Sequence, residues 1–207
     1  MRTSRSVGLS LAAMVMVLAA RASAGAEPLA VVTVNAPAVN CVAHKSCKVK
    51  VTDSVGQVAA QPGLSGGRLQ SRTIAGAAGT PSTGKTLYLY RVDLANAWGS
   101  AECIAGMVLN FGPVTKLPYK KGGSPADVFV ITSGGLGTVG LQSAQQDGDV
   151  ITFAFSKLLC VGQKPGKGVS TFFFGLASAT APKPTTATVF SIGSPPFIEV
   201  PARAPSH

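Results

Sequence analysis

The most conspicuous residues that could do chemistry form the stretch GTPSTGKT at 79–86, which matches the phosphate-binding P-loop pattern letter for letter. In nucleotide-binding proteins, backbone N–H groups of the loop and of the following helix hold phosphates, while the lysine and threonine meet the outer phosphates and magnesium. Here a glycine-alanine loop precedes the motif and Thr86 opens a strand pattern. The sequence therefore predicts a loop without this function, and no cofactor.

Acidic residues are the next group to test, because glycoside cleavage needs two carboxylates that face one sugar. Most of the 8 acidic residues lie at expected strand ends or turns, where Asp is favoured for backbone reasons. Asp147 and Asp149 could offer oxygen ligands to calcium, but no further acid is near them in the sequence, so we predict no metal site. A hydrolytic triad would need His44, Asp53 and a serine such as Ser54. Since His44 is expected inside a small disulfide loop, we assign no catalytic residue.

Two aromatic residues, Trp98 and Tyr119, lie in expected connections between strands. Trp98 is in the segment NAWGSAEC, and Tyr119 follows a proline and precedes two lysines. Carbohydrate-binding sandwiches use such rings as stacking platforms, so these two are the predicted ligand-binding residues. The alternative is that Trp98 plugs the end of the sandwich near Cys103, as tryptophans beside disulfides often do.

The chain has four cysteines, which in exported proteins are typical of two disulfides, and three pairings are possible. We favour Cys41 with Cys47, which would close a small loop, and Cys103 with Cys160, which would join two distant strands. In the loop-entropy model the longer loop removes freedom worth about 4 kcal/mol from the unfolded chain. Cys41 and Cys47 lack the two-residue spacing of a redox or zinc pair.

The clearest elements that could position these residues lie at 134–160, where two strands flank a tight turn. Asp147-Gly148 suits a type I′ turn, which needs positive φ at both central positions. After the turn, Ile151, Phe153 and Phe155 share one face of a strand, and smaller or polar residues share the other. A hairpin with one apolar face needs a second sheet to cover it.

The rest of the chain is a series of short strand patterns. CKVKVTD at 47–53 alternates strictly, so we expect a half-buried strand with lysines on its wet face. Residues 54–86 form an expected long loop with one short strand at 70–74. TLYLYRVDL at 86–94 is apolar on both faces and is expected to be a central strand, with partners at 104–111 and 127–132. The other strand candidates are LAVVTVNA at 29–36, which Pro37 ends, STFFFGLAS at 170–178, TATVFSI at 186–192 and FIEV at 197–200.

About nine short strands, with no sustained helical period after the first segment, predict an all-β protein with a single β-sandwich. Jelly-roll and immunoglobulin-like topologies both fit. We place the sandwich at 25–194, and a proline-punctuated tail at 195–207.

The first segment, 1–24, has the features of a cleaved signal peptide. Arg2 and Arg5 precede an apolar run at 7–20, and the small residues of Ala22-Ser23-Ala24 follow. The run is shorter than the roughly 18 residues that a membrane span requires, so we expect no transmembrane anchor. The prediction is a secreted or periplasmic protein.

The charge is basic but scattered. Loss of 1–24 would reduce the 18 basic residues by three to 15, against 8 acidic ones, a net charge of +7. No arginine stripe or set of stacking aromatics accompanies this charge, so we expect no nucleic-acid partner. An anionic envelope surface or an acidic polysaccharide is the more natural partner, although a merely solvated surface would have the same composition.

The stretches CVAHKSCKVKVTDS, GGLGTVGLQSA and STFFFGLASATAP resemble those of small exported bacterial all-β proteins of uncharacterised function. The resemblance spans most of the chain after 1–24, and it implies an envelope or extracellular setting.

Taken together, the sequence favours an exported, non-enzymatic β-sandwich that binds a polysaccharide or another envelope component. Two alternatives stay open. One is a secreted hydrolase whose residues meet only in three dimensions, and the other is a structural or adhesive protein with a protein partner, which should expose a sheet edge or an apolar patch.

Overall fold

The computed structural model describes residues 25–58, 66–98, 103–120, 122–192 and 196–206, so the expected signal peptide lies outside this part of the chain. No helix in these ranges has the length and apolar character needed to cross a membrane. Within them the chain forms twelve strands and one helix: β1 (Glu27–Pro28), β2 (Val31–Asn35), α1 (Ala36–Ala43), β3 (Thr52–Gln57), β4 (Arg68–Ala75), β5 (Thr86–Asp93), β6 (Cys103–Asn110), β7 (Val128–Ser133), β8 (Leu141–Asp147), β9 (Val150–Cys160), β10 (Phe174–Ser178), β11 (Pro182–Ser191) and β12 (Phe197–Pro205).

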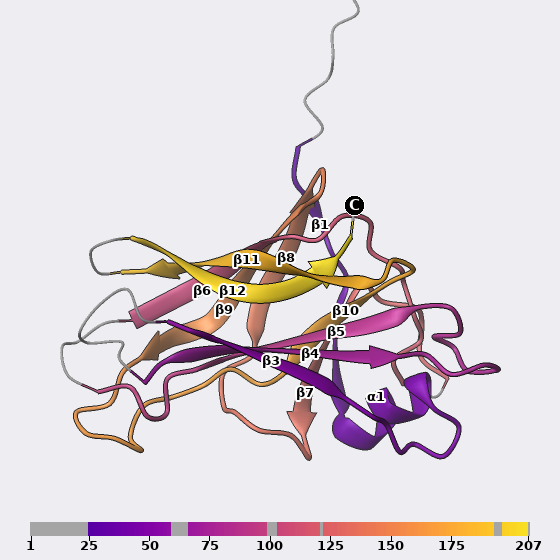
Figure 1. Ribbon diagram of the computed structural model, residues 1–207, viewed down its shortest axis with the longest axis horizontal. Coiled ribbons are helices and arrows are strands. Elements are labelled where there is room, and N and C mark those ends of the chain that lie inside the picture. Colours follow the sequence, from indigo (N-terminus) through magenta and orange to yellow (C-terminus); the bar gives the residue numbers. More distant parts are fainter. Residues whose placement is uncertain (1–24, 59–65, 99–102, 121, 193–195, 207) are drawn as a thin grey trace, which may run out of the picture.

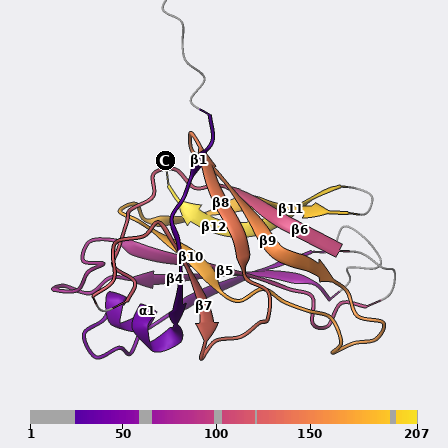
Figure 2. The same cartoon turned by 180° about the vertical axis from the view of Figure 1, so that it is seen from behind.

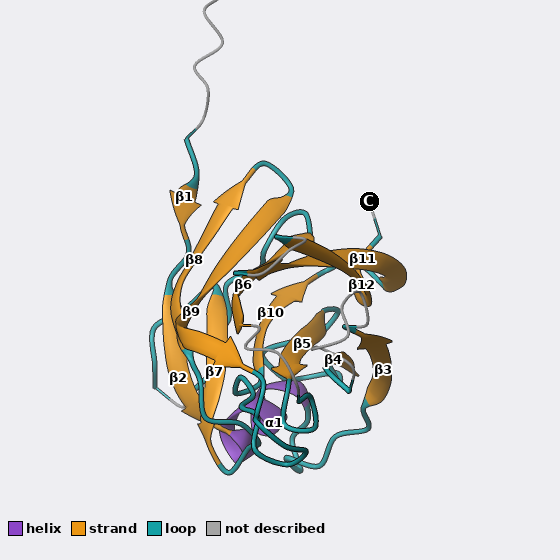
Figure 3. Cartoon of the chain, turned by 90° about the vertical axis from the view of Figure 1, so that its left-hand side faces the viewer, coloured by secondary structure: helices purple, strands orange, loops and turns teal. Residues whose placement is uncertain are grey.

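The strands form two six-stranded sheets that pack against each other (Figures 1 and 3). Sheet I has the order β1-β8-β9-β6-β11-β12, and sheet II has the order β2-β7-β10-β5-β4-β3. Neighbouring strands are antiparallel except for β2 and β7, which are parallel. The two-sheet, all-β architecture predicted from the sequence is confirmed. Twelve strands in the described residues replace the expected nine, in part because β1 was not among the strand candidates. β3 also extends past the strand expected at 47–53, and β4 extends on both sides of the short strand expected at 70–74.

The main core lies between the sheets, and Phe174 of β10 is at its centre. Its ring centroid lies 4.9 Å from that of Phe153 in sheet I and 6.1 Å from that of Tyr90 in sheet II. Each such side chain, fully buried, contributes about 1.5–3 kcal/mol relative to an exposed one. Alternate residues of β9 supply this core, since Ile151, Phe153 and Phe155 are buried as the sequence predicts.

The predicted hairpin is the pair β8–β9, but its turn is one residue further along than expected. Asp147 is opposite Val150 in the ladder, which leaves Gly148 and Asp149 as the central residues. Gly148 has a φ of 56°, whereas Asp149 is not among the residues of positive φ. Positive φ at the first central residue alone is the pattern of a type II′ turn, so the type I′ prediction is wrong. Glycine is what the first position of such a turn requires.

β5 is a central strand, as predicted, but its expected partners are wrong. Its neighbours are β4 and β10, whereas the segments at 104–111 and 127–132 contribute β6 of sheet I and β7 at a different place in sheet II. The sequence pattern of β4 explains the error. Arg68, Gln70 and Arg72 alternate with Leu69 and smaller polar residues, so β4 shows little of the apolar character by which a strand is recognised.

A helix that the sequence did not predict covers the outer face of sheet II. β2 ends at Asn35, whose side chain accepts a hydrogen bond from the Ala38 N–H at 2.8 Å and caps α1, and Pro37 occupies the first turn. Eight residues are too few to show a sustained helical period. Figures 1 and 2 show α1 on the side of sheet II away from sheet I. Beneath it is a second core, formed by residues from α1, β2, β4, β5, β7 and β10 and from two further segments: Val34, Val39, Val42, Ala43, Ile74, Leu87, Leu89, Leu117, Tyr119, Ala126, Phe129, Ile131, Phe173 and Ala177.

Both disulfides have the favoured pairing. Cys41 is bonded to Cys47 just after α1, and Cys103 is bonded to Cys160, directly opposite it in the β6–β9 ladder. Each therefore fixes a different layer of the molecule, the first beside the covered face of sheet II and the second within sheet I.

The sheets approach each other closely at the β3–β12 edge. A Cβ atom at Gly56 of β3 would collide with the carbonyl oxygen of Pro201 in β12. β12 continues to Pro205, well beyond the FIEV stretch, and therefore runs through the segment that the sequence predicts as tail. Ala202 and Ala204 are buried in the main core.

Candidate functional site

A gap opens in sheet II where β3 separates from β4. The last pair in their ladder is Thr52 opposite Thr73, yet β4 continues to Ala75. Before Thr52, Val49 and Val51 pack against the second core, which draws segment 48–51 away from the edge of β4. The end of β4 is thereby left without a strand neighbour on that side.

This separation corrects the prediction for 47–53 in part. Val49 and Val51 are half-buried and Lys48 and Lys50 are exposed, as the alternation predicts. Only the residues from Thr52 on form a strand, because the valines meet the second core rather than the core between the sheets.

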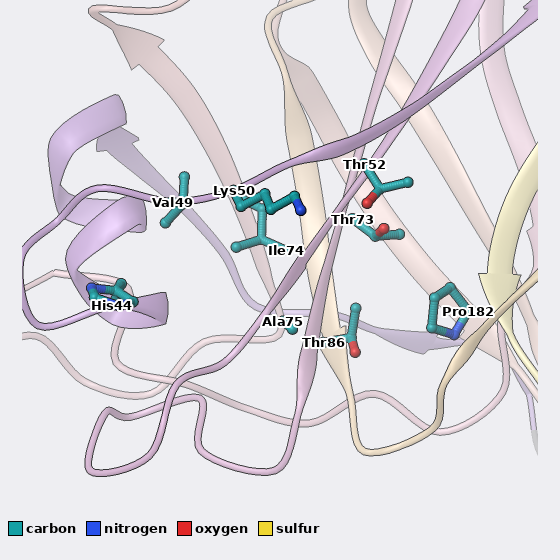
Figure 4. A pocket seen from close by; sticks show the side chains of 9 residues that line it. All are labelled: His44, Val49, Lys50, Thr52, Thr73, Ile74, Ala75, Thr86 and Pro182. Carbon is teal, nitrogen blue, oxygen red and sulfur yellow. The ribbon is translucent and has the colours of Figure 1, made fainter.

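The gap holds a cavity of about 450 Å³, which we call the β3–β4 cavity (Figure 4). It is shared between segment 44–52, the end of β4, the start of β5 and the start of β11. Its lining residues are His44, Val49, Lys50, Thr52, Thr73, Ile74, Ala75, Thr86 and Pro182.

The polar lining of the β3–β4 cavity consists of one ammonium, one imidazole and three hydroxyl groups, with no carboxylate among the described lining residues. Figure 4 shows the Lys50 side chain directed towards Thr52 and Thr73, with Thr86 on the neighbouring strand. An ammonium is a point charge with three donors, and a threonine hydroxyl both donates and accepts. The cavity is therefore suited to a ligand that carries hydroxyl groups and a negative charge.

The Cys41–Cys47 disulfide and the end of α1 position this segment. The His44 N–H donates to the Asn40 carbonyl oxygen at 2.8 Å, and Cys47 has a φ of 56°, which turns the chain towards Lys50. The His44 Nδ1 atom lies 2.8 Å from the Ser46 hydroxyl. Together these bonds hold the loop that carries one wall of the cavity.

An ion pair lies next to the cavity on the outer face of sheet II. Arg72 donates from Nε and Nη2 to the two Asp53 carboxylate oxygens at 2.7 and 2.9 Å. The hydrogen bond from Arg72 holds the pKa of Asp53 below its ordinary value. The guanidinium carbon lies 4.8 Å from the centroid of the Phe173 ring, so Arg72 is fixed on two sides.

A second charged cluster follows along the same face. Asp93 accepts hydrogen bonds from Arg68 at 2.9 and 3.1 Å, from Arg91 at 3.0 Å and from the Ala95 N–H at 3.0 Å. Burial alone would raise the pKa of Asp93, but these bonds and the two positive charges lower it. Arg91 also donates to Ser170 at 2.9 Å, while its buried Nε has no hydrogen-bond partner in the described structure.

The described structure assembles neither the hydrolytic triad nor the metal site considered from the sequence. His44 contacts Ser46 and Asp53 is bound by Arg72, so the triad of His44, Asp53 and a serine is not formed. Within the described residues no three His, Cys, Asp or Glu side chains lie close enough to hold a metal ion, and this includes the region of Asp147 and Asp149. The arrangement can bind and orient a ligand.

The two predicted ligand-binding aromatics lie in different settings. Trp98 is 51% exposed, with its backbone bridged to Gly162, so about half of this residue is accessible to solvent. Tyr119 is fully buried in the second core, where its ring centroid lies 4.6 Å from that of Phe129. The described structure shows no ring contact between Trp98 and Tyr119, and neither lines the β3–β4 cavity.

The P-loop-like stretch is a loop, as predicted. Thr86 opens β5 rather than a helix, so the helical N–H groups that a phosphate site needs are missing at this point. Instead the loop packs on the end of α1, where the Ser82 hydroxyl donates to the Val42 carbonyl oxygen at 2.9 Å.

The sequence reasoning did not identify the β3–β4 cavity. The alternation of Lys48 and Lys50 with Val49 and Val51 predicts a solvent-exposed strand face, but nothing local indicates that β3 separates from β4 at Thr52. The three threonines come from three strands whose pairing the sequence does not reveal.

Comparison with known proteins adds no assignment, because neither a family model nor a curated protein nor a solved structure matches this chain.

Proposed function

We propose that the protein is an exported, non-enzymatic binding module that holds an acidic polysaccharide of the cell envelope in the β3–β4 cavity. The observation that carries the proposal is the composition of the lining, in which Lys50 and three threonines face a space without a carboxylate. A sugar offers hydroxyls to the threonines, and an acidic group on it compensates the lysine. A neutral ligand would leave the ammonium without a counter-charge.

The strand edge beside the cavity supports a polymeric ligand. β4 continues to Ala75 after its last pair with β3, so its backbone groups can bond to a ligand that lies along the strand. An exposed lysine–carboxylate contact contributes only about 0–1 kcal/mol. Useful affinity therefore has to come from several such contacts along a chain.

The setting of the molecule agrees with this role. Two disulfides persist in an oxidising compartment, which fits a secreted or periplasmic protein. The excess of basic residues over acidic ones would attract an anionic polymer before any specific contact forms.

The test is a calorimetric titration of the oxidised protein with polygalacturonate, with dextran as a neutral control. We expect binding to polygalacturonate only, and a several-fold loss with Lys50→Gln. Lys157→Gln, an exposed lysine of β9, should leave the affinity unchanged. Raising salt from about 0.1 M to about 1 M shortens the screening length from about 10 Å to about 3 Å and should weaken binding. Equal binding of dextran, or full affinity in Lys50→Gln, would contradict the proposal.

A further inference from the structure

A second cavity of about 230 Å³ adjoins the β3–β4 cavity, and we call it the Arg72 cavity. Val49 and Ile74 line both cavities, so they form a common wall. On the far side of this wall the lining passes from β4 to the end of β7 and to α1. The residues that line only the Arg72 cavity are Ala36, Asn40, Val51, Arg72, Leu89, Ile131, Gly134, Gly135, Leu136 and Phe173.

We infer that the Arg72 cavity is a second subsite, which takes the next carboxylate-bearing unit of the polysaccharide held in the β3–β4 cavity. The inference rests on the proposed function, because it concerns the same ligand. It adds the chemistry of that ligand, namely acidic groups on neighbouring units, and names Arg72 as the residue that meets the second one.

The geometry of Arg72 suits this role. Asp53 binds Nε and Nη2, while the Phe173 ring lies against the guanidinium plane. Among the described residues, none accepts a hydrogen bond from Nη1, which is therefore the nitrogen available to a ligand. A guanidinium held on two sides loses little conformational entropy when a carboxylate binds, so Arg72 is preorganised for this contact.

Positive charges outnumber negative charges on the outer face of sheet II, so this face would attract an anion. Three arginines, Arg68, Arg72 and Arg91, share two carboxylates, those of Asp53 and Asp93. Arg91 is only 7% exposed and its Nε has no partner in the described structure. Asp53 compensates Arg72 within the Arg72 cavity, so the excess of positive charge lies beside it, in the cluster of Arg68 and Arg91 on one side and at Lys50 across the common wall on the other.

The two subsites also lie beside each other along β4. Arg72 and Ile74 are two residues apart, so their side chains point to the same covered face of sheet II, and Ile74 lines both cavities. At about 3.4 Å per residue, Arg72 lies roughly 7 Å along the strand from this common wall. A chain that extends past Val49 and Ile74 on this face therefore enters the second cavity.

The experiment compares galacturonic acid with its dimer and trimer, titrated into the oxidised protein and followed by amide chemical shifts in NMR spectra. In the wild type we expect the dimer to bind about tenfold more tightly than the monomer. Arg72→Gln should abolish this gain, while the shifts that the monomer causes at residues 44–52 of the β3–β4 cavity remain. Asp53→Asn breaks the same ion pair but keeps the guanidinium and removes a negative charge, so it should bind the dimer more tightly than the wild type. Lys157→Gln is the charge control.

The outcomes separate this inference from the proposed function. If Arg72→Gln keeps the tenfold gain, the second subsite is overturned, while monomer binding that depends on Lys50 leaves the proposed function standing. If Asp53→Asn loses the gain as completely as Arg72→Gln, the ion pair acts through the local structure and not through a ligand contact, which also overturns the inference. If no acidic sugar binds the wild type, the proposed function fails first and the second subsite with it.

Discussion

The two sheets of the sandwich have outer faces of different construction. Sheet II is covered by α1 and by segment 48–51, with a second core beneath them. In the described residues no helix packs on the outer face of sheet I, which instead presents rows of mostly polar or small apolar side chains. One such row runs straight across five strands: Gln145, Thr152, Val108, Thr188 and Glu199.

The difference shows how a flat sheet acquires a binding site. Covering segments provide walls, and both cavities considered above lie where segment 48–51 rests on sheet II. The charged clusters also lie on that face. The main feature of the outer face of sheet I is the aromatic pair of Phe190 and Phe197. Their ring centroids are 5.6 Å apart, and Phe197 is 59% exposed. An adhesive role with a protein partner, the alternative left by the sequence, would use this pair.

The largest effect is expected from the charged cluster on the covered face. Asp93→Asn leaves Arg91 buried without its carboxylate, which should lower the free energy of unfolding by about 3–5 kcal/mol. Asp53→Asn, on the same face but partly exposed, should cost no more than about 1 kcal/mol. Urea denaturation of the two variants measures both values. If the two variants lose similar amounts of unfolding free energy, the greater burial of Asp93 does not make its ion pairs more important than that of Asp53.

The pH dependence of the free energy of unfolding gives a second test of the Asp93→Asn variant. Because the folded-state pKa of Asp93 lies below its ordinary value of 3.8, the carboxylate stabilises the fold fully above that pH. This contribution is lost as the pH falls through the lower, folded-state pKa. The stability difference between the wild type and Asp93→Asn should therefore narrow on acidification.

Removal of each disulfide should have a different effect on stability and on binding. Replacing Cys103 and Cys160 by serine opens a loop with a sequence separation of 57 residues in sheet I and should cost about 4 kcal/mol. Replacing Cys41 and Cys47, which are six residues apart, should cost about 2 kcal/mol but also weaken polygalacturonate binding, because this bond holds the segment that carries Lys50. Thermal melts and titrations of both double variants check this. Unchanged binding without the Cys41–Cys47 bond would show that the site does not need it.

The smallest effect concerns the covered core itself. The Tyr119 hydroxyl is buried without a hydrogen-bond partner in the described structure, so Tyr119→Phe should stabilise the protein by about 1 kcal/mol. Tyr88→Phe is the matched control, since the Tyr88 hydroxyl donates to the Thr180 carbonyl oxygen at 2.6 Å and its loss should cost about 1 kcal/mol. Destabilisation by Tyr119→Phe would indicate that the hydroxyl does have a partner.

The sequence predicts what depends on local pattern. The two-sheet class, both disulfides, the apolar face of β9 and the central position of β5 follow from alternation, cysteine spacing and two-sided burial. The sequence does not indicate α1, because eight residues give little more than two turns of helical period. Pro37 predicts the end of a strand at the point where the structure has the first turn of a helix. β4 was underestimated because its arginines and glutamine point to the covered face, where polar residues weaken the apolar signal.

The site was largely beyond prediction because it is assembled from distant segments. Lys50, Thr73 and Thr86 belong to separate parts of the chain, and only the register of β3, β4 and β5 brings them together. Trp98 was identified by residue type, and its exposure keeps its predicted role open. Tyr119 was identified in the same way, but the second core that encloses it requires α1, which the sequence did not reveal.

The most direct test of the account is an amide chemical-shift map of the oxidised protein titrated with a galacturonic acid trimer. We predict that the largest shifts fall around the two cavities of sheet II, at residues 44–52, around Arg72 and Thr73, and at Thr86. The largest shifts at Phe190 and Phe197, on the outer face of sheet I, would contradict the account and place the ligand on the other face of the sandwich.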